Sequence, residues 1–165
     1  MIESNIAIRS IEAKDNPALA KVIRQTLVEF GANHAGTVYY DESTDRLSTL
    51  FTMAGSAYFV AEQDGEILGG GGIFPTQGLG DDTCELVKMY LLPATRGKGL
   101  GAALLQKCIA FAINYGYKNM YLETMPELSL AIQLYQKAGF EKLDSPLGQS
   151  GHFGCGIWML LKLKE

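Results

Sequence analysis

The sequence predicts a single domain of mixed α/β (α+β) class, in which helices pack on a mostly antiparallel sheet. Three observations lead to this prediction. Apolar residues form runs typical of strands and runs at helical spacing, in alternation. Three strand-like runs follow one another in the middle of the chain, and a basic glycine loop then leads into a helix. With 165 residues, the chain is long enough for one core, so we expect one domain over residues 1–165.

The composition indicates a globular protein and argues against several classes of partner. The chain is 47% hydrophobic and 19% charged, and its formal net charge of -4 disfavours a nucleic-acid binder. Cys84, Cys108 and Cys155 are odd in number and lack metal-ligand spacing, which favours buried thiols in a reducing compartment. No signal peptide and no apolar run of about 20 residues is visible, so we expect a cytoplasmic protein that does not enter a membrane.

The N-terminal part of the chain predicts one strand followed by two helices. Residues 5–10 form the strand. Asn16 is expected to cap a helix that has Pro17 in its first turn and ends at Gly31. A polar, aromatic loop over residues 32–42 precedes a second helix that begins near Ser43.

Two strands come next, over residues 57–61 and 67–74, joined by a hairpin turn. Asp64 and Gly65 are typical turn residues for such a hairpin. The second strand contains four successive glycines, at positions 69–72. Glycine inside a strand marks a bulge or a close approach of another group, and either tight packing of a helix on the sheet or a ligand would explain the run.

The C-terminal half predicts two helix–strand units. The central strand spans residues 84–92, and the helix after the glycine loop ends at Gly116. A strand over residues 120–124 leads to a helix that Pro126 opens and Gly139 closes. A strand over residues 140–143, a loop over 144–154 and a final strand over 155–163 complete the chain.

The glycine loop has the features of an anion site, most often one for phosphate. Gly97, Gly99 and Gly101 allow a tight turn and a close approach of backbone N–H groups to a ligand. The loop enters a helix N-terminus, where N–H groups lack internal partners and the helix dipole is positive. Arg96 and Lys98 add positive charge at the same place.

Known phosphate-binding loops fit this stretch unequally. A nucleoside-triphosphate P-loop is excluded, because Lys98 is followed by Gly99 and not by Ser or Thr. A dinucleotide fingerprint is formally met by Gly97, Gly99 and Ala102. The antiparallel strands before it are the wrong context, so a dinucleotide-dependent reductase is a minor alternative.

A third pattern, Arg-x-x-Gly-x-Gly at Arg96, Gly99 and Gly101, resembles the GNAT acyltransferase superfamily. Residues 131–140, Ala-Ile-Gln-Leu-Tyr-Gln-Lys-Ala-Gly-Phe, match a second block of that family, in the same order and at a similar separation. The resemblance covers residues 57–143 and implies a GNAT-like sheet of about seven strands with four helices. It also implies acetyl-CoA as the acyl donor co-substrate. Leu128 departs from the pattern, because many members have an Asn there that binds the cofactor arm.

The resemblance implies where acetyl-CoA binds. The pyrophosphate would lie on the backbone of the glycine loop, the pantetheine arm would pair with the central strand at Met89 and Leu91, and the Leu91 N–H would polarise the thioester carbonyl. The implied cofactor-binding residues are Met89, Tyr90, Leu91, Arg96, Gly97, Lys98, Gly99, Leu100, Gly101 and Ala102.

The same resemblance suggests catalytic roles. Tyr135 matches the family's general acid, although a tyrosine on an amphipathic helix can equally be a core residue. For the base we favour Glu85, since strand alternation places positions 85, 87, 89 and 91 on one face. Glu123 or water is the rival base. Tyr39, Tyr40, Glu123 and His152 are candidates for binding the acceptor, and no residue cluster suggests a metal site.

The predicted function is therefore transfer of an acetyl group from acetyl-CoA to a primary amine on a small molecule or peptide. A non-catalytic sensor that binds acyl-CoA is the alternative. The sequence leaves the identity of the acceptor open, and a homodimer is compatible with it.

Overall fold

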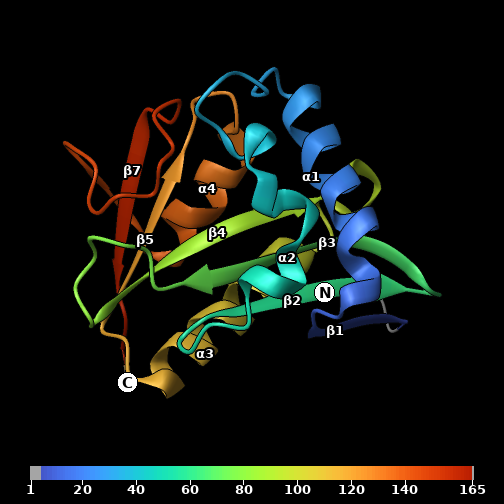
Figure 1. Cartoon of the computed structure of the whole chain (residues 1–165), viewed down its shortest axis with the longest axis horizontal. Coiled ribbons are helices and arrows are strands. Elements are labelled where there is room, and N and C mark those ends of the chain that lie inside the picture. Colours follow the sequence, from blue (N-terminus) through green and yellow to red (C-terminus); the bar gives the residue numbers. More distant parts are fainter. Residues whose placement is uncertain (1–4, 165) are drawn as a thin grey trace.

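The computed structural model describes residues 5–164, which form one sheet of seven strands in the order β1-β2-β3-β4-β5-β7-β6 (Figure 1). Neighbouring strands are antiparallel except for β4 and β5, which run parallel. This arrangement confirms the predicted mixed, mostly antiparallel sheet. The strands are β1 (Ile6–Ser10), β2 (Ala57–Gln63), β3 (Glu66–Phe74), β4 (Thr83–Leu91), β5 (Asn119–Thr124), β6 (Glu141–Leu143) and β7 (Ile157–Lys162).

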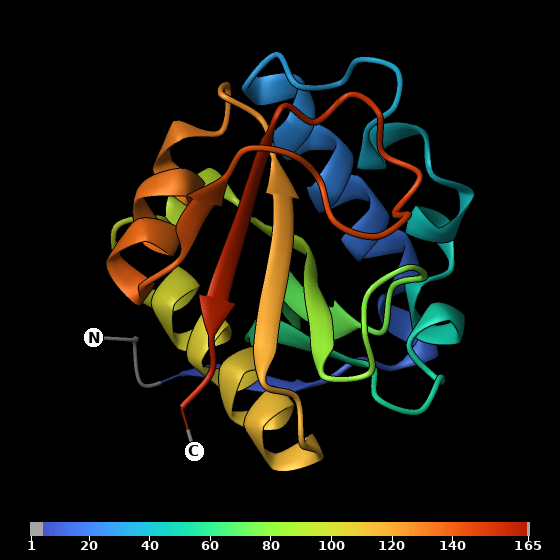
Figure 2. The ribbon, with the colours of Figure 1, turned by 90° about the vertical axis from the view of Figure 1, so that its left-hand side faces the viewer.

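Helices cover both faces of the sheet, with α1 and α2 on one side and α3 and α4 on the other (Figure 2). The core is correspondingly divided: one apolar cluster contains Leu19, Ile23 and Leu47, and another contains Leu105 and Cys108. The helices are α1 (Asn16–Glu29), α2 (Leu47–Leu50), α3 (Leu100–Tyr115) and α4 (Ser129–Ala138), and short 3-10 turns lie at η1 (Ala13–Asp15), η2 (Val38–Tyr40), η3 (Glu42–Asp45) and η4 (Pro93–Thr95).

Three predicted helix starts are wrong in detail. Asn16 does not cap α1; its side-chain oxygen accepts a hydrogen bond from the Ser48 N–H (2.9 Å), and its amide donates to the Ser48 hydroxyl (2.8 Å). Asn16 therefore joins α1 to α2. The helix expected from Ser43 is divided into η3 and α2, and α4 begins at Ser129, three residues after Pro126.

The glycine run in β3 is explained by packing against neighbouring strands. A Cβ at Gly70 or Gly72 would lie 2.6–2.7 Å from the ring of Tyr58, and one at Gly71 would lie 3.0 Å from the Met89 side chain. The fourth glycine, Gly69, has φ +147°, and a Cβ there would collide with the backbone of β4. Most of the close neighbours are strand residues, and the Phe51 ring at the end of α2 lies 3.1 Å from the Cβ position of Gly72. Tight packing, mainly between strands, therefore accounts for the run.

A β-bulge interrupts β4 at Lys88. Gly70 pairs with Tyr90 and Gly72 pairs with Val87, so one residue of β3, Gly71, stands opposite two of β4, Lys88 and Met89. Lys88 has φ +52°, a left-handed conformation that is uncommon for a residue with a side chain. The buried Tyr58 hydroxyl donates a hydrogen bond to the Lys88 carbonyl (2.7 Å), which stabilises the bulge.

The bulge reverses the side-chain alternation in the second half of β4. Val87 packs in the cluster under α1, whereas Met89 and Leu91 pack in the clusters under α3. The prediction that Glu85, Val87, Met89 and Leu91 share one face is therefore wrong, because an inserted residue shifts the two-residue period.

The pairing of β4 with β5 is short. Only Thr83, Cys84 and Glu85 of β4 have partners in β5, which are Asn119, Met120 and Tyr121. Beyond Glu85 the two strands diverge, and one edge of β4 from residue 86 to residue 91 faces a gap (Figure 1). This part of β4 contains Met89 and Leu91, with which the resemblance implies that a pantetheine arm would pair.

The packing of Tyr58 against β3 can be tested with two alanine substitutions. We expect Gly72→Ala to lower the free energy of unfolding by about 1–3 kcal/mol, because its Cβ would lie 2.4 Å from the Ala57 carbonyl oxygen. Gly156→Ala is the matched control, since nothing lies within 4 Å of its Cβ position. It should be neutral or stabilise by about 0.4–1 kcal/mol. Equal unfolding curves in urea for the two variants would contradict this account.

Candidate active site

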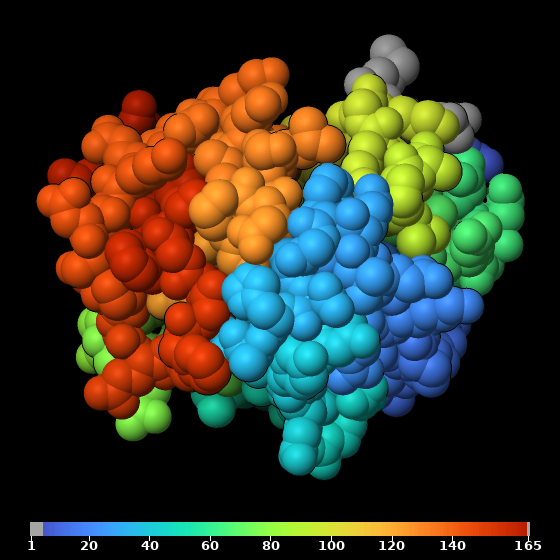
Figure 3. Space-filling model, turned by 90° about the horizontal axis from the view of Figure 1, so that it is seen from above, coloured from blue at the N-terminus to red at the C-terminus, as the bar shows by residue number. Residues whose placement is uncertain are grey.

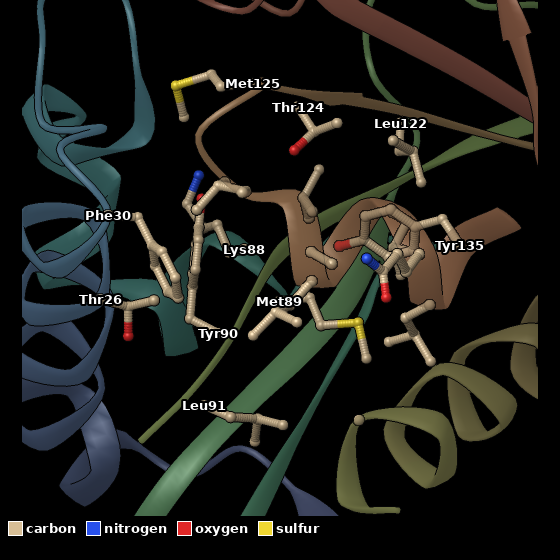
Figure 4. Close-up of a pocket in the computed structure, with 18 of the residues that line it drawn as sticks. Thr26, Phe30, Lys88, Met89, Tyr90, Leu91, Leu122, Thr124, Met125 and Tyr135 are labelled. Carbon is tan, nitrogen blue, oxygen red and sulfur yellow. The ribbon is translucent and has the colours of Figure 1, made fainter. Parts of the chain in front are cut away.

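The gap between β4 and β5 is a cavity of about 450 Å³. Its walls come from β4, β5, the glycine loop and α4, and Tyr135 projects into it from α4 opposite the residues of β4 (Figure 4). Residues far apart in the sequence thus meet at one place. Of the predicted site residues, the cavity is lined by Glu85, Met89, Tyr90, Leu91, Arg96, Gly97, Gly99, Gly101, Ala102, Glu123, Tyr135 and His152.

The glycine loop has the predicted geometry for binding an anion. Gly97 and Gly99 both have positive φ, at +77° and +81°, and Gly99 immediately precedes α3. No atom lies within 4 Å of the Cβ position at Gly97, so its surface is open. The N–H groups of the first turn of α3 lie beyond the reach of any acceptor within the helix. They are available at the end of the cavity where the helix dipole is positive.

Arg96 is engaged by the protein itself. Its guanidinium donates two hydrogen bonds to the Glu29 carboxylate (2.6 and 3.0 Å) and one to the Leu91 carbonyl (2.8 Å), and it lies over the Phe30 ring at 4.9 Å. These contacts fasten the glycine loop to α1. Two other predicted cofactor residues do not line the cavity: the Leu100 side chain is buried in the core, and Lys98 lies outside the lining.

Tyr135 is a buried residue whose hydroxyl stays protonated. Its ring packs edge-on against Phe140, with 5.7 Å between the ring centroids. Burial raises the pKa of the Tyr135 phenol well above its ordinary value, and the nearby Cys108 acts in the same direction. A tyrosine in this state can donate a proton at neutral pH. The Tyr135 ring also packs in an apolar core cluster, as expected for a core residue. The interpretation as a general acid concerns its hydroxyl.

Glu85 is a nearly buried carboxyl, 3% exposed, near the point where β4 and β5 separate. Burial is the largest influence on it and, together with Glu123, raises the pKa of Glu85 to about 7; a hydrogen bond from the Thr76 hydroxyl (2.6 Å) opposes the shift. A group with a pKa near neutrality exchanges protons readily at physiological pH.

Glu123 lines the cavity from the end of β5. It accepts hydrogen bonds from the Tyr121 hydroxyl (2.8 Å) and from the Ser150 hydroxyl. In the part of the chain that the structure describes, no lysine or arginine forms an ion pair with Glu85 or Glu123. The cavity therefore contains two carboxyl groups held by neutral donors.

The acceptor candidates from the loops divide into two groups. His152 lines the cavity, whereas Tyr39 and Tyr40 lie outside its lining. The Tyr39 ring lies under the Arg24 guanidinium, and Tyr40 is 63% exposed. Space-filling Figure 3 shows residues near 40 against the loop that precedes β7, and the contact is made by Asp41, whose carboxylate binds the His152 ring (2.6 Å).

Sequence reasoning missed several residues that shape this site. Thr76, Lys88, Asp41 and Ser150 act through contacts between distant segments, and none belongs to a motif. Cys155 also lines the cavity, but burial raises the pKa of its thiol to about 12, so it is not a nucleophile at neutral pH. Among residues 5–164, no three His, Cys, Asp or Glu side chains are grouped as a metal site, and no helix is long and apolar enough to cross a bilayer.

Comparison with known proteins identifies a family for this chain. Residues 21–140 match the model of the acetyltransferase (GNAT) family. The chain is 45% identical over 157 residues to the Escherichia coli (strain K12) protein named uncharacterised N-acetyltransferase YjgM, and the match covers 94% of each chain.

Solved structures share the fold. An acetyltransferase of the GNAT family from Staphylococcus aureus superposes with a TM-score of 0.82 at 20% identity, covering 96% of this chain and 99% of that one. The acetyltransferase yncA from Salmonella typhimurium, determined with its cofactor acetyl-CoA, gives a TM-score of 0.75 at 20% identity and covers 98% and 96%.

The raised pKa of Glu85 predicts a dependence of stability on pH. The folded protein binds the proton of the Glu85 carboxyl group more tightly than the unfolded chain does. The free energy of unfolding should therefore fall as the pH rises from 4.5, the ordinary pKa of this group, to about 7. The fall amounts to roughly 3 kcal/mol. Glu85→Gln should remove this part of the pH dependence in urea titrations.

Thr76→Val provides the second arm of this test. It removes the hydrogen bond that lowers the pKa of Glu85, so the fall in stability should extend to higher pH. If Glu85→Gln keeps the wild-type slope between pH 4.5 and 7, Glu85 is not the group responsible.

Proposed function

The chain belongs to the GNAT family of acetyltransferases, and from this premise we propose that it transfers the acetyl group of acetyl-CoA to a primary amine. One observation carries the proposal. A single cavity extends from the glycine loop, with its anion-binding geometry, to Tyr135, Glu85 and His152. A long cofactor can therefore be anchored at one end of the cavity while its reactive group lies beside proton donors and acceptors at the other.

The residues of the glycine loop and β4 suit acetyl-CoA. The N–H groups at positions 97–102 would hold the pyrophosphate at the start of α3. The Leu92 N–H donates to the Leu68 carbonyl on β3 (2.9 Å), so by alternation the Leu91 N–H faces the open edge. There it would pair with the pantetheine arm and polarise the thioester carbonyl, as the resemblance implies. One such donor is worth about 3 kcal/mol in an oxyanionic transition state.

Leu128 changes one contact with the cofactor arm. It lines the cavity and is 8% exposed within the apolar cluster under α1. It offers apolar contact where many relatives have a hydrogen-bonding Asn. We propose that binding of the arm here depends on the β4 backbone and on apolar contact.

Acetyl transfer requires that the amine nitrogen loses a proton and that the thioester sulfur gains one. In our proposal Glu85 accepts a proton from the attacking amine, with Glu123 or water as the alternative base, and Tyr135 donates a proton to the sulfur that leaves. The pKa of Glu85, about 7, suits a base, and the raised pKa of Tyr135 means that its hydroxyl carries a proton at neutral pH. Glu85 and Glu123 favour an acceptor that carries positive charge, either a small molecule or a peptide amine.

The second candidate function is an acyl-CoA-binding module without catalysis. The glycine loop alone would serve either function. The presence of Glu85 and Tyr135 in the same cavity favours the enzyme, because binding alone does not need a buried carboxyl group that exchanges protons near pH 7.

Thermal-shift titration tests the cofactor assignment. We expect acetyl-CoA at about 100 times its dissociation constant to stabilise the protein by roughly 2.7 kcal/mol. NAD and ATP at the same concentration should have little effect, because the loop lacks the P-loop pattern and its glycines follow antiparallel strands, which is the wrong context for a dinucleotide site. A shift with NAD and none with acetyl-CoA would contradict the proposal. Release of CoA thiol across a panel of amines would then distinguish the enzyme from the binding module.

Tyr135→Phe tests the general acid. We expect kcat to fall by about 10²-fold while the dissociation constant of acetyl-CoA changes little, because only the proton donor is removed. Tyr117→Phe is the matched control: it is also buried and donates a hydrogen bond (2.8 Å, to the Gly55 carbonyl), but it lies outside the cavity lining. Equal activity of Tyr135→Phe and the wild type would remove Tyr135 from this role.

A further inference from the structure

Two side chains from distant segments converge on one carboxylate oxygen of Asp41 beside the cavity. Oδ2 of Asp41 accepts a hydrogen bond from Nε2 of His152 (2.6 Å) and another from Nζ of Lys88 (3.3 Å). Asp41 lies between η2 and η3, Lys88 is the bulge residue of β4, and His152 lies in the loop before β7. We refer to these three residues as the Asp41 cluster.

The Asp41 cluster determines which nitrogen of His152 carries the proton. Burial works against ionisation of Asp41, but the hydrogen bond from His152 and the charge of Lys88 more than offset it, so the pKa of Asp41 is lowered. An ionised carboxylate only accepts hydrogen bonds. Nε2 of His152 must therefore carry a proton, and in the neutral ring Nδ1 is left as the proton acceptor.

We propose that His152 is a second proton acceptor in the acetyl transfer, held in the required tautomer by Asp41. The ring of His152 lines the same cavity as Glu85 and Tyr135. The proposal rests on the proposed function, because it assigns a role in the same reaction. Asp41 and Lys88 are positioning residues that act through His152.

The proton balance of the reaction explains why two acceptors are useful. The amine arrives as R–NH3+ and ends as an amide N–H, so its nitrogen loses two protons as the N–C bond forms and the C–S bond breaks. The sulfur gains one proton from Tyr135 and leaves as a thiol. One of the two nitrogen protons replaces the proton that Tyr135 gives up, and the other goes to solvent, so the net release is one proton.

The two acceptors differ in their access to water. The His152 side chain is 12% exposed, whereas Glu85 is 3% exposed. We assign to His152 the proton that leaves the ammonium before attack and passes to solvent. Glu85 then takes the second proton as the N–C bond forms. Other ionisable groups that line the cavity are Glu123, Cys155, Tyr90, Lys88, Arg96 and Lys137.

Lys88 links the backbone of β4 to this histidine. Its left-handed conformation is unfavourable for a residue with a side chain, and the Lys88 side chain is 5% exposed at its ion pair with Asp41. The same residue presents its carbonyl to Tyr58. The backbone of Lys88 therefore forms the bulge in β4, while its side chain binds Asp41, the residue that orients His152.

Nitrogen NMR of the ligand-free protein tests the tautomer directly. The chain has two histidines, so His34→Gln leaves His152 as the single ring signal. We expect Nε2 to carry a proton, with an Nε2–H that exchanges slowly with water because it is bonded to Asp41. Asp41→Ala should remove that slow exchange. A neutral ring protonated at Nδ1, or fast exchange in the wild type, would overturn the proposed role of Asp41.

Kinetics test the role of His152 in the reaction. We expect His152→Ala to lower kcat by about 10²-fold, with little change in the KM for acetyl-CoA, and added imidazole to restore much of kcat. Asp41→Asn should lower kcat less and should not respond to imidazole. His34→Ala, outside the cavity lining, is the control and should behave as the wild type.

The outcomes separate this proposal from the proposed function. A wild type that binds acetyl-CoA but transfers to no amine would refute the proposed function. A wild type that is active together with an equally active His152→Ala would refute the present inference alone. A third outcome would also count against His152 as a proton acceptor. In it, His152→Ala loses kcat and imidazole does not restore it, although acetyl-CoA still stabilises the variant.

Discussion

The site depends on the short pairing between β4 and β5. Parallel strands normally continue side by side, because every backbone N–H and C=O group that leaves water needs a partner. Here the ladder ends at Glu85 and Tyr121, and β4 continues with one edge open. The Leu91 carbonyl on this edge accepts a hydrogen bond from Arg96, and the Leu91 N–H points toward the cavity, where a ligand could pair with it as an added strand would. In the proposed function, a cofactor arm with amide groups would pair with this edge of β4 as an added strand.

Several contacts keep this opening in place without a ligand. The Tyr58 hydroxyl binds the Lys88 carbonyl from the α1 side, and α4 supplies Leu134 and Tyr135 to the far wall. The glycines of β3 belong to the same arrangement, because any side chain at Gly70 or Gly72 would displace the Tyr58 ring. The site also has an electrostatic cost: burial, and to a smaller extent the nearby Glu123 carboxylate, raises the pKa of Glu85. Perturbed pKa values of this kind are common in active sites, and the proposed function gives Glu85 the role of a proton acceptor.

The sequence predicted the features that arise from local chemistry. Asp64 and Gly65 adopt positive φ in the hairpin, as their residue types require, and Gly116 and Gly139 end α3 and α4 in the left-handed conformation. The glycine loop and Tyr135 were found because their motifs are short and continuous. Lys88 was missed because no residue type signals a left-handed lysine, and the whole face assignment of β4 changed with it. Asn16 was misjudged for a similar reason: its side chain binds Ser48, a partner 32 residues away that helix rules do not consider.

The contacts of Arg96 clarify how the glycine loop would hold a phosphate. A cationic side chain in such a loop suggests direct pairing with the ligand, but the Arg96 guanidinium is already paired with Glu29 and bonded to the Leu91 carbonyl. Its charge is largely balanced within the protein. The attraction for an anion must then come mainly from the N–H groups at the start of α3 and from the helix dipole, which are built into the backbone and act over a short range. Arg96 serves the site by fixing the loop against α1, so that these N–H groups stay aligned with the cavity that leads to Tyr135.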